Sequence, residues 1–323
     1  MSFTLPNIGV LGTGSYTPKT KVTNEDLAKI VNTSDEWIKQ RTGITTRSFS
    51  SEQENVYVMG AIAALKALHD ANLRQEDITE IVFGTNGTGE NIVPNAASIT
   101  QYLIGVNNIS CYDVAMGCTG GLKAIECAYG SILKKHLLNR IPNPKIFVIA
   151  GDTLSNVLDI QDRTTCILLG DGAGALVLGF QDEPWIVSAD TYSKGSPEIF
   201  YRSGLRTGSG LEAVFDKKDL ESNNAGYLFR QDGKEVFKFA TRAIEQIIKE
   251  TSFRLNIKPE EFYHIMHQAN LRIIEAAAER LGLPKEKVYT DGIINEGNTS
   301  GASYIIGLDR AVKQKRWVFK WGE

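Results

Sequence analysis

The cysteine at position 118 has the sequence context of a nucleophile. Cys118 lies at a strand-to-helix turn, after a predicted strand at 108–114 and at the start of a predicted helix at 117–133. A thiol in the first turn of a helix meets free backbone N–H groups, so we expect the pKa of Cys118 to lie below the usual value of about 8.5. A cysteine taken alone is more often a small buried hydrophobe, and the other three are interpreted in that way: Cys111, Cys127 and Cys166.

Two further polar residues lie at similar junctions. His267 follows the apolar pair Ile265-Met266 at a predicted strand end, and Asn298 follows a glycine at a predicted helix start. Each alone is more often structural, the histidine as a partly buried ring and the asparagine as a helix cap. Together with Cys118, they would supply a nucleophile and two hydrogen-bond donors for an oxyanion.

The elements that must position these residues alternate between strand and helix. Apolar runs predict strands at 80–84, 145–150 and 175–178, and helical spacing predicts helices at 23–31, 55–71, 233–249 and 271–281. This alternation indicates an α/β fold. The first half ends near 179–183, which predicts two halves, 1–180 and 181–323, although no internal repeat is visible. The second half has a strand predicted at 185–189 and a long polar excursion at 193–226.

Composition excludes several classes of protein. The chain has 323 residues, and its 35 Lys+Arg against 38 Asp+Glu give a formal charge of −3. We therefore expect no nucleic-acid partner. The first residues do not form a signal peptide and no run of 18 apolar residues occurs, so we expect a cytoplasmic protein without a membrane partner. No Cys/His spacing is typical of a metal site, and the thiols should be reduced.

Five segments carry a more specific signal than any single residue. They read TSDEWI with RTGI (33–38 and 41–44), DVAMGCTG (113–120), GDGAGA (170–175), HQANLR (267–272) and GNTS (297–300). In this order, over residues 8 to about 312, they resemble the β-ketoacyl-acyl-carrier-protein synthase III family of thiolase-like condensing enzymes.

This resemblance implies a five-layer α-β-α-β-α fold of two duplicated halves and a homodimer with the Cys118 loop near its twofold axis. It also implies that Cys118 is acylated by an acyl-CoA, which is a substrate, so that no cofactor is needed. His267 and Asn298 then assist the decarboxylation of malonyl-acyl carrier protein, and the resulting carbanion attacks the acyl-cysteine. Two donors in a dry site would stabilise the charge that develops on the thioester oxygen.

The resemblance extends to further positions. Trp37 resembles the residue that stacks on the CoA adenine, and Arg163 the residue on the other face of that base. The residues similar to those lining the CoA channel and the catalytic pocket are Arg41, Asn270, Gly233 and Phe237. The candidates for contact with an acidic carrier protein are Lys238, Arg272 and Arg280, although surface cations are usually only solvated.

Two departures from the family pattern carry expectations. Val93, before Pro94, stands where many members have a bulky aromatic residue that closes the acyl pocket of the partner subunit, which predicts a primer larger than acetyl. The ending from Lys313 to Glu323 does not resemble the two closing strands of the family, whose backbone supplies one oxyanion donor. Loss of that donor would lower the rate by about 10²- to 10³-fold.

Alternative functions remain open at this point. Gly12 and Gly14 after a predicted strand at 8–11 resemble part of a dinucleotide-binding turn, but the third glycine is missing and a plain tight turn explains the pair. A condensing enzyme of secondary metabolism, an acyltransferase without decarboxylation, or a catalytically impaired homologue that only binds CoA or carrier protein would share the same segments.

Overall fold

The computed structural model describes residues 7–87, 93–158, 160, 162–182, 191–192, 199–202 and 228–315. The predicted strand at 185–189, most of the excursion at 193–226 and the atypical end at 316–323 lie outside these residues. No helix in the described part combines the length and apolar character needed to cross a membrane.

A five-stranded sheet forms the centre of the first half. Its strands are β1 (Ile8–Tyr16), β4 (Glu80–Gly84), β5 (Ser110–Val114), β6 (Ile146–Asp152) and β7 (Gly172–Phe180), in the spatial order β1-β7-β6-β4-β5. β4 is parallel to β5 and β6, whereas β7 is antiparallel to β1 and β6. Every residue of β4 and β6 is buried, as expected for strands covered on both faces.

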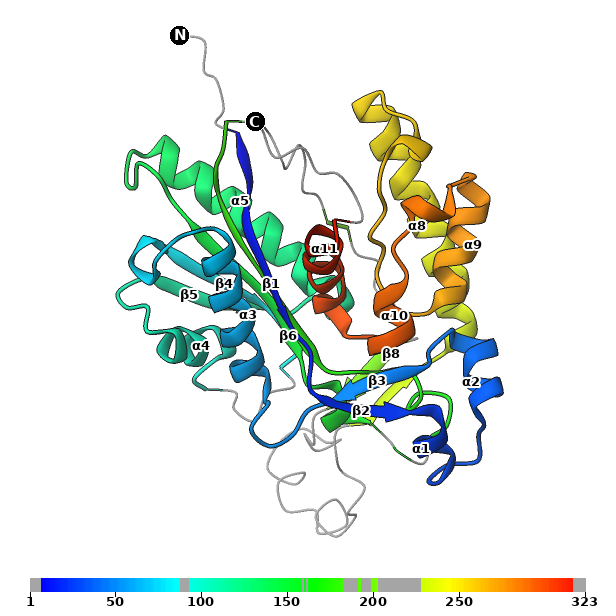
Figure 1. The fold of residues 1–323 in the computed structure, drawn as a ribbon. Helices are drawn as coiled ribbons and strands as arrows, with labels where there is room; N and C mark the ends of the chain where they lie inside the picture. The colour runs from blue at the N-terminus through cyan, green and yellow to red at the C-terminus, as the bar shows by residue number, and fades with distance from the viewer. Residues whose placement is uncertain are drawn as a thin grey trace, which may run out of the picture.

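Two pairs of helices cover the faces of this sheet (Figure 1). α3 (Val56–Asp70) and α4 (Ala96–Ile104) pack on one face, while α5 (Gly120–Leu137) and α11 (Ser303–Lys313) pack on the other. The strands alternate accordingly: Phe83 faces the cluster of α3 and Val82 faces that of α5 and α11. Because α11 comes from the second half of the chain, the two halves share a core.

The glycines of β1 correct the dinucleotide-binding alternative. Gly12 and Gly14 lie inside β1 and not in a turn after it. A Cβ atom on Gly12 would stand 2.4 Å from the carbonyl oxygen of Ala67, and one on Gly14 would stand 2.1 Å from that of Ala63. These glycines therefore allow α3 to approach the strand closely, and the pair has no phosphate-binding geometry.

The remaining elements surround the site. β2 (Thr20–Thr23) and β3 (Thr46–Phe49) pair antiparallel, and α1 (Asn24–Ala28) and α2 (Asp35–Thr42) lie between them in the sequence. α10 (Asp291–Glu296) contacts β3. α8 (Gly233–Leu255) packs on α9 (Leu271–Leu281), beyond α11 as seen from the sheet (Figure 1). β8 (Ile199–Arg202) pairs antiparallel with β9 (Leu228–Gln231).

Most of the predicted elements are confirmed, although several differ in extent: β1 continues to Tyr16 instead of 11, and α1 ends at Ala28 instead of 31. α8 continues to Leu255, six residues beyond the predicted end at 249, and stops at Asn256, whose φ of 53° is left-handed. The strand predicted before His267 is an isolated parallel bridge between His264 and Val288 in the described residues. The turn that contains His267 follows this bridge directly in the sequence.

Candidate active site

Cys118 lies at the predicted strand-to-helix junction. β5 ends at Val114, a short 3-10 turn spans Gly117–Thr119, and α5 starts at Gly120. Gly117 has a left-handed φ of 54°, which favours glycine. A Cβ atom on Gly121 would stand 2.2 Å from the carbonyl oxygen of Gly301. Glycine at 121 is therefore required for the nucleophile turn to contact the segment that follows Asn298.

The electrostatic expectation for Cys118 is wrong. Burial raises the pKa of the Cys118 thiol to about 11; a hydrogen bond from the Ser300 side chain opposes this increase, while the charge of Asp152 adds to it. Loss of solvent around the sulfur thus outweighs the stabilisation expected from the helix start. At neutral pH the resting side chain is a thiol.

His267 lies in the turn between the bridge at His264 and α9. Its Nδ1 atom is 2.8 Å from Ser303 Oγ, and its ring centroid is 5.4 Å from that of Tyr304. Its Nε2 atom is buried and makes no hydrogen bond with the described residues. Burial lowers the pKa of His267 to about 4, so the ring is neutral at neutral pH.

Asn298 is held at both its backbone and its side chain. Its N–H donates to the Leu168 carbonyl (2.8 Å), and its carbonyl accepts from the Gly170 N–H (3.0 Å). Its side-chain Oδ1 accepts from the Ser300 N–H at 2.9 Å. Because this bond occupies the acceptor end of the amide, the Nδ2 donor end is left for a ligand.

The segment 298–304 brings the three predicted catalytic residues together. It contains Asn298 itself, and Ser303 contacts His267. Tyr304 donates from its hydroxyl to the Cys118 carbonyl at 3.0 Å while its ring lies against His267. One rigid segment at the start of α11 therefore connects the nucleophile turn, the histidine turn and the asparagine.

A buried polar chain also reaches this segment and was not predicted. Asp152 accepts from the Asn86 backbone N–H (2.9 Å) and from Asn86 Nδ2 (2.8 Å), and Nδ2 also donates to Ser300 Oγ (2.9 Å). Ser300 has a left-handed φ of 52°, which these contacts stabilise. The signal available in the sequence was the three hydroxyl residues within 299–303, namely Thr299, Ser300 and Ser303, just before and at the start of a buried helix.

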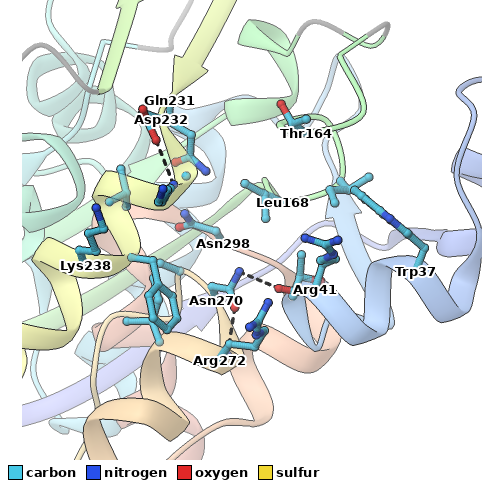
Figure 2. A pocket seen from close by; sticks show the side chains of 18 residues that line it. Trp37, Arg41, Thr164, Leu168, Gln231, Asp232, Lys238, Asn270, Arg272 and Asn298 are labelled. Carbon is cyan, nitrogen blue, oxygen red and sulfur yellow. Dashed lines mark hydrogen bonds between the residues drawn. The ribbon is translucent and has the colours of Figure 1, made fainter.

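A cavity of about 780 Å³ opens beside Asn298 (Figure 2). It is lined by residues of α2, α8, α9 and the loop at 164–168, and several of them were predicted: Trp37, Arg41, Gly233, Phe237, Lys238, Asn270, Arg272 and Asn298. Cys118 and His267 do not line it. Asn298 is thus the predicted catalytic residue that joins this cavity to the buried contacts.

Two arginines lie near the Trp37 ring at the edge of the cavity. Ser34 caps α2 by accepting from the Trp37 N–H, which places the indole in the first turn. The guanidinium carbon of Arg163 is 4.9 Å from the ring centroid and that of Arg41 is 5.6 Å from it. Arg163 also donates to the Asn32 carbonyl at 3.1 Å. This arrangement is a cationic aromatic stack suited to a planar, anionic ligand.

The other predicted positions have more ordinary surroundings. Asn270 caps α9, accepting from the Arg272 N–H (2.9 Å) and donating to the Arg41 carbonyl (3.2 Å), so its polar atoms are already used. Arg280 lies 3.6 Å from Glu245 and Lys238 lies 2.6 Å from Glu235.

Val93 has few neighbours in the single chain. In the single chain, 83% of Val93 is exposed, just before α4. The described chain brings no wall of a pocket against it, and it does not line the cavity beside Asn298.

Comparison with known proteins identifies close relatives. Residues 112–195 match the family model described as 3-oxoacyl-[acyl-carrier-protein (ACP)] synthase III, and residues 253–318 match its C-terminal model. A β-ketoacyl-[acyl-carrier-protein] synthase III of Shewanella oneidensis is 38% identical over 308 residues, which cover 95% of this chain and 91% of that protein. The protein of the same description from Clostridium acetobutylicum is also 38% identical, over 309 residues.

Solved structures agree with these matches. The crystal structure of 3-oxoacyl-[acyl-carrier-protein] synthase III from Aquifex aeolicus superposes with a TM-score of 0.80 at 34% identity, covering 96% of this chain and 92% of that one. The priming β-ketosynthase of the R1128 polyketide pathway superposes with a TM-score of 0.80 at 26% identity, covering 98% and 91%. The predicted α/β, thiolase-like fold class is thereby confirmed.

Proposed function

The chain belongs to the β-ketoacyl-acyl-carrier-protein synthase III family of condensing acyltransferases, which initiate fatty-acid synthesis, and we propose that it does so with Cys118 as nucleophile and His267 and Asn298 as donors. One observation carries this assignment of roles. The second polar atom of each donor is already engaged, Nδ1 of His267 with Ser303 and Oδ1 of Asn298 with Ser300. Both side chains therefore have one polar atom left for a substrate.

The first step loads the primer. The Cys118 thiol loses its proton and the sulfur attacks the thioester carbon of acyl-CoA; the new C–S bond replaces the bond to CoA, which leaves as a thiol after taking up a proton. The cavity beside Asn298 would hold the CoA chain, with Trp37 and the cations around it at the mouth. Stacking and charge there contribute affinity, whereas the bond changes occur at the buried sulfur.

The second step joins two carbons. A malonyl group carried by acyl carrier protein loses CO₂, and the electron pair of the broken C–C bond forms an enolate on the remaining thioester. His267 and Asn298 would donate hydrogen bonds to its oxygen. The enolate carbon then attacks the acyl-Cys118 carbonyl, the C–S bond breaks, and the thiolate takes up a proton. A neutral histidine fits this role because it keeps a donor without adding a charge to a dry site.

The assembly and setting are also proposals. We infer a homodimer because β5 is an edge strand of the sheet and Tyr102 and Val93, both 83% exposed, lie near it in sequence on and before α4. The two halves are taken as 1–180 and 181–323. The four cysteines form no disulfide, which favours a cytosolic location, and the reaction needs only protein groups and two thioester substrates, without a cofactor.

The primer is the open part of the proposal. Val93, in place of an aromatic ring, predicts that the dimer accepts an acyl group larger than acetyl. The similarity to a priming ketosynthase of polyketide synthesis favours, as a second candidate, a role in making a secondary metabolite. The identity of the primer separates these pathways better than the fold does.

Intact-protein mass spectrometry tests the nucleophile and the primer together. Wild-type protein and Cys118→Ala are incubated with a panel of acyl-CoA thioesters that includes acetyl, longer linear and branched groups. We expect wild type to gain the mass of one acyl group, with preference for a primer larger than acetyl, and the variant to gain none. Folded wild-type protein that gains no mass with any member would contradict the proposal and favour a homologue that only binds.

A further inference from the structure

His267 has a choice of tautomer that decides what it can do. Its ring is buried and neutral at neutral pH, because burial lowers its pKa to about 4. A neutral imidazole carries one proton, on Nδ1 or on Nε2. With the proton on Nε2, the atom facing the buried site is a donor. With the proton on Nδ1, the same atom presents a lone pair.

The hydrogen bonds of Ser303 distinguish the two tautomers. Ser303 is 2% exposed, and its hydroxyl has two partners in the described residues: the Gln268 N–H, which donates to Oγ at 3.3 Å, and His267 Nδ1 at 2.8 Å. A backbone N–H can only donate. The hydroxyl proton therefore has one acceptor in the described part of the chain, which is Nδ1.

The alternative tautomer leaves a buried proton without a partner. If Nδ1 carried the proton, Ser303 Oγ would accept twice and its own proton would have no acceptor among the described residues. Nε2 has no partner among the described residues in either tautomer. With the proton on Nε2, the Nε2–H is the one group of the pair left unsatisfied; with the proton on Nδ1, both the Ser303 O–H and the Nε2 lone pair are left unsatisfied. Since each buried unsatisfied polar group is costly, the Nε2–H tautomer is favoured.

The geometry assigns Ser303 as the positioning residue that donates to His267 Nδ1 and so keeps the proton of the imidazole on Nε2. This assignment comes from the hydrogen-bond network. It deepens the proposed function and rests on it only for its catalytic consequence: an Nε2–H would donate to the enolate oxygen, whereas a lone pair there would repel it.

The surroundings hold Ser303 and Gln268 in place. Gln268 is 1% exposed and all of its side-chain groups are used: Nε2 donates to the carbonyls of Met266 (2.7 Å) and Tyr289 (3.2 Å), and Oε1 accepts from the Ile293 N–H (3.1 Å). Ser303 begins α11, and Ile305, two residues later, packs against Gly174 of β7. Neither Ser303 nor Gln268 can move away from His267 without breaking buried contacts.

Nitrogen-15 NMR reads the tautomer directly. The chain has four histidines, so ¹⁵N-histidine labelling gives a spectrum of few signals, and a His267→Asn variant identifies the one of interest. At pH 7 we expect the His267 Nε2 of wild type to have the shift of a protonated nitrogen and Nδ1 that of an unprotonated acceptor. A protonated Nδ1 in wild type overturns the assignment.

Substitution of Ser303 tests whether its hydroxyl causes the tautomer preference of His267. In Ser303→Ala we expect a mixed tautomer population and a decrease of about 10- to 100-fold in malonyl-thioester decarboxylation, with acylation of Cys118 within a few-fold of wild type. Ser303→Thr keeps the hydroxyl and should restore both the wild-type tautomer and the decarboxylation rate. Ser252→Ala is the matched control, because the Ser252 hydroxyl is also buried and has no hydrogen-bond partner in the described residues.

The outcomes separate this inference from the proposed function. An unchanged tautomer in Ser303→Ala overturns the role of Ser303, even where the decarboxylation rate falls. Wild-type protein with the Nε2–H tautomer but no decarboxylation supports the inference and contradicts the proposed function. If Ser303→Ala fails to fold, Ser303→Cys, which retains only a weak donor, supplies the same comparison.

Discussion

The two ends of the site are built on different principles. At the buried end, hydrogen bonds made by the segment 298–304 hold His267, Asn298 and Cys118 in place. At the mouth, the exposed side chains of Arg41 and Arg163 lie near the Trp37 ring. The buried end lacks solvent, so each donor there has a large effect on a developing charge, whereas charges at the mouth are screened by water and salt.

This contrast teaches where rate and affinity should be sought. Changes at the buried end should lower the rate of a chemical step and leave binding of CoA intact. Changes at the mouth should weaken binding and leave the chemical steps intact.

Asn298→Asp should have the largest effect. Aspartate keeps an oxygen that accepts from the Ser300 N–H but replaces the Nδ2 donor by an anionic oxygen. We expect malonyl-thioester decarboxylation to fall by about 10²- to 10³-fold. The measurement is release of CO₂ from the malonyl substrate, with acylation of Cys118 measured by mass in the same samples. Equal losses in both steps would show that Asn298 acts on the whole fold and not on the enolate.

The pH dependence of thiol reactivity should be nearly as large. With a pKa of about 11 for Cys118, the thiolate fraction is small at neutral pH and rises about tenfold per pH unit below the pKa. Alkylation of Cys118 by iodoacetamide should therefore accelerate about 100-fold from pH 7 to pH 9. Glutathione, a free thiol, is the reference and should level off near its own pKa. A plateau already at pH 7 would restore the sequence-based expectation of a lowered pKa.

The pKa of Cys118 was predicted wrongly because a local sequence pattern contains no information on long-range contacts. The junction of β5 and α5 was predicted because strand and helix periodicities change within a few residues. The surroundings of Cys118 come from distant parts of the chain: Ser300 and Asp152 act on its thiol, and Tyr304 of α11 donates to its carbonyl from 186 positions away. No pattern near Cys118 contains these contacts, so the helix-start effect was visible in the sequence and the desolvation was not.

The donors of the site were partly predictable for the same reason. His267 and Asn298 lie in turns that the sequence indicates, and the family segments around them made their roles specific. Ser303 and Asn86 act through long-range contacts, and a serine at the start of a helix is an ordinary cap in the absence of its neighbours. The tight turn predicted at the glycines of β1 was wrong because a turn and a close contact with a helix both require glycine, so the sequence does not distinguish them.

Trp37→Ala should affect binding at the mouth. Loss of the indole near Arg41 and Arg163 removes stacking and cation–π contacts worth about 1–2 kcal/mol, so we expect KM for acyl-CoA to rise about 5- to 30-fold with kcat within twofold of wild type. Steady-state kinetics at saturating malonyl carrier protein measure both. Trp37→Phe keeps an aromatic face, so its KM for acyl-CoA should lie between those of wild type and Trp37→Ala. A lower kcat with an unchanged KM would contradict the division between mouth and buried end.

Removal of one surface cation should have the smallest effect, and the structure ranks the candidates. Lys238 and Arg280 lie near Glu235 and Glu245, respectively. Arg272 contacts the Phe237 ring at 5.9 Å, and no carboxylate of the described residues forms an ion pair with it. A cation without an acidic neighbour should contribute more to the attraction of an acidic carrier protein.

We therefore expect Arg272→Ala to raise KM for malonyl carrier protein about 3- to 10-fold at low salt, and Arg280→Ala to raise it less than about twofold. Increasing the salt concentration should reduce the difference, because screening acts on exposed charges. KM for acyl-CoA, measured with the same variants, separates the carrier from the CoA, since Arg272 also lines the cavity. An equal increase for both substrates would place Arg272 in the CoA channel and leave the carrier surface to be sought elsewhere.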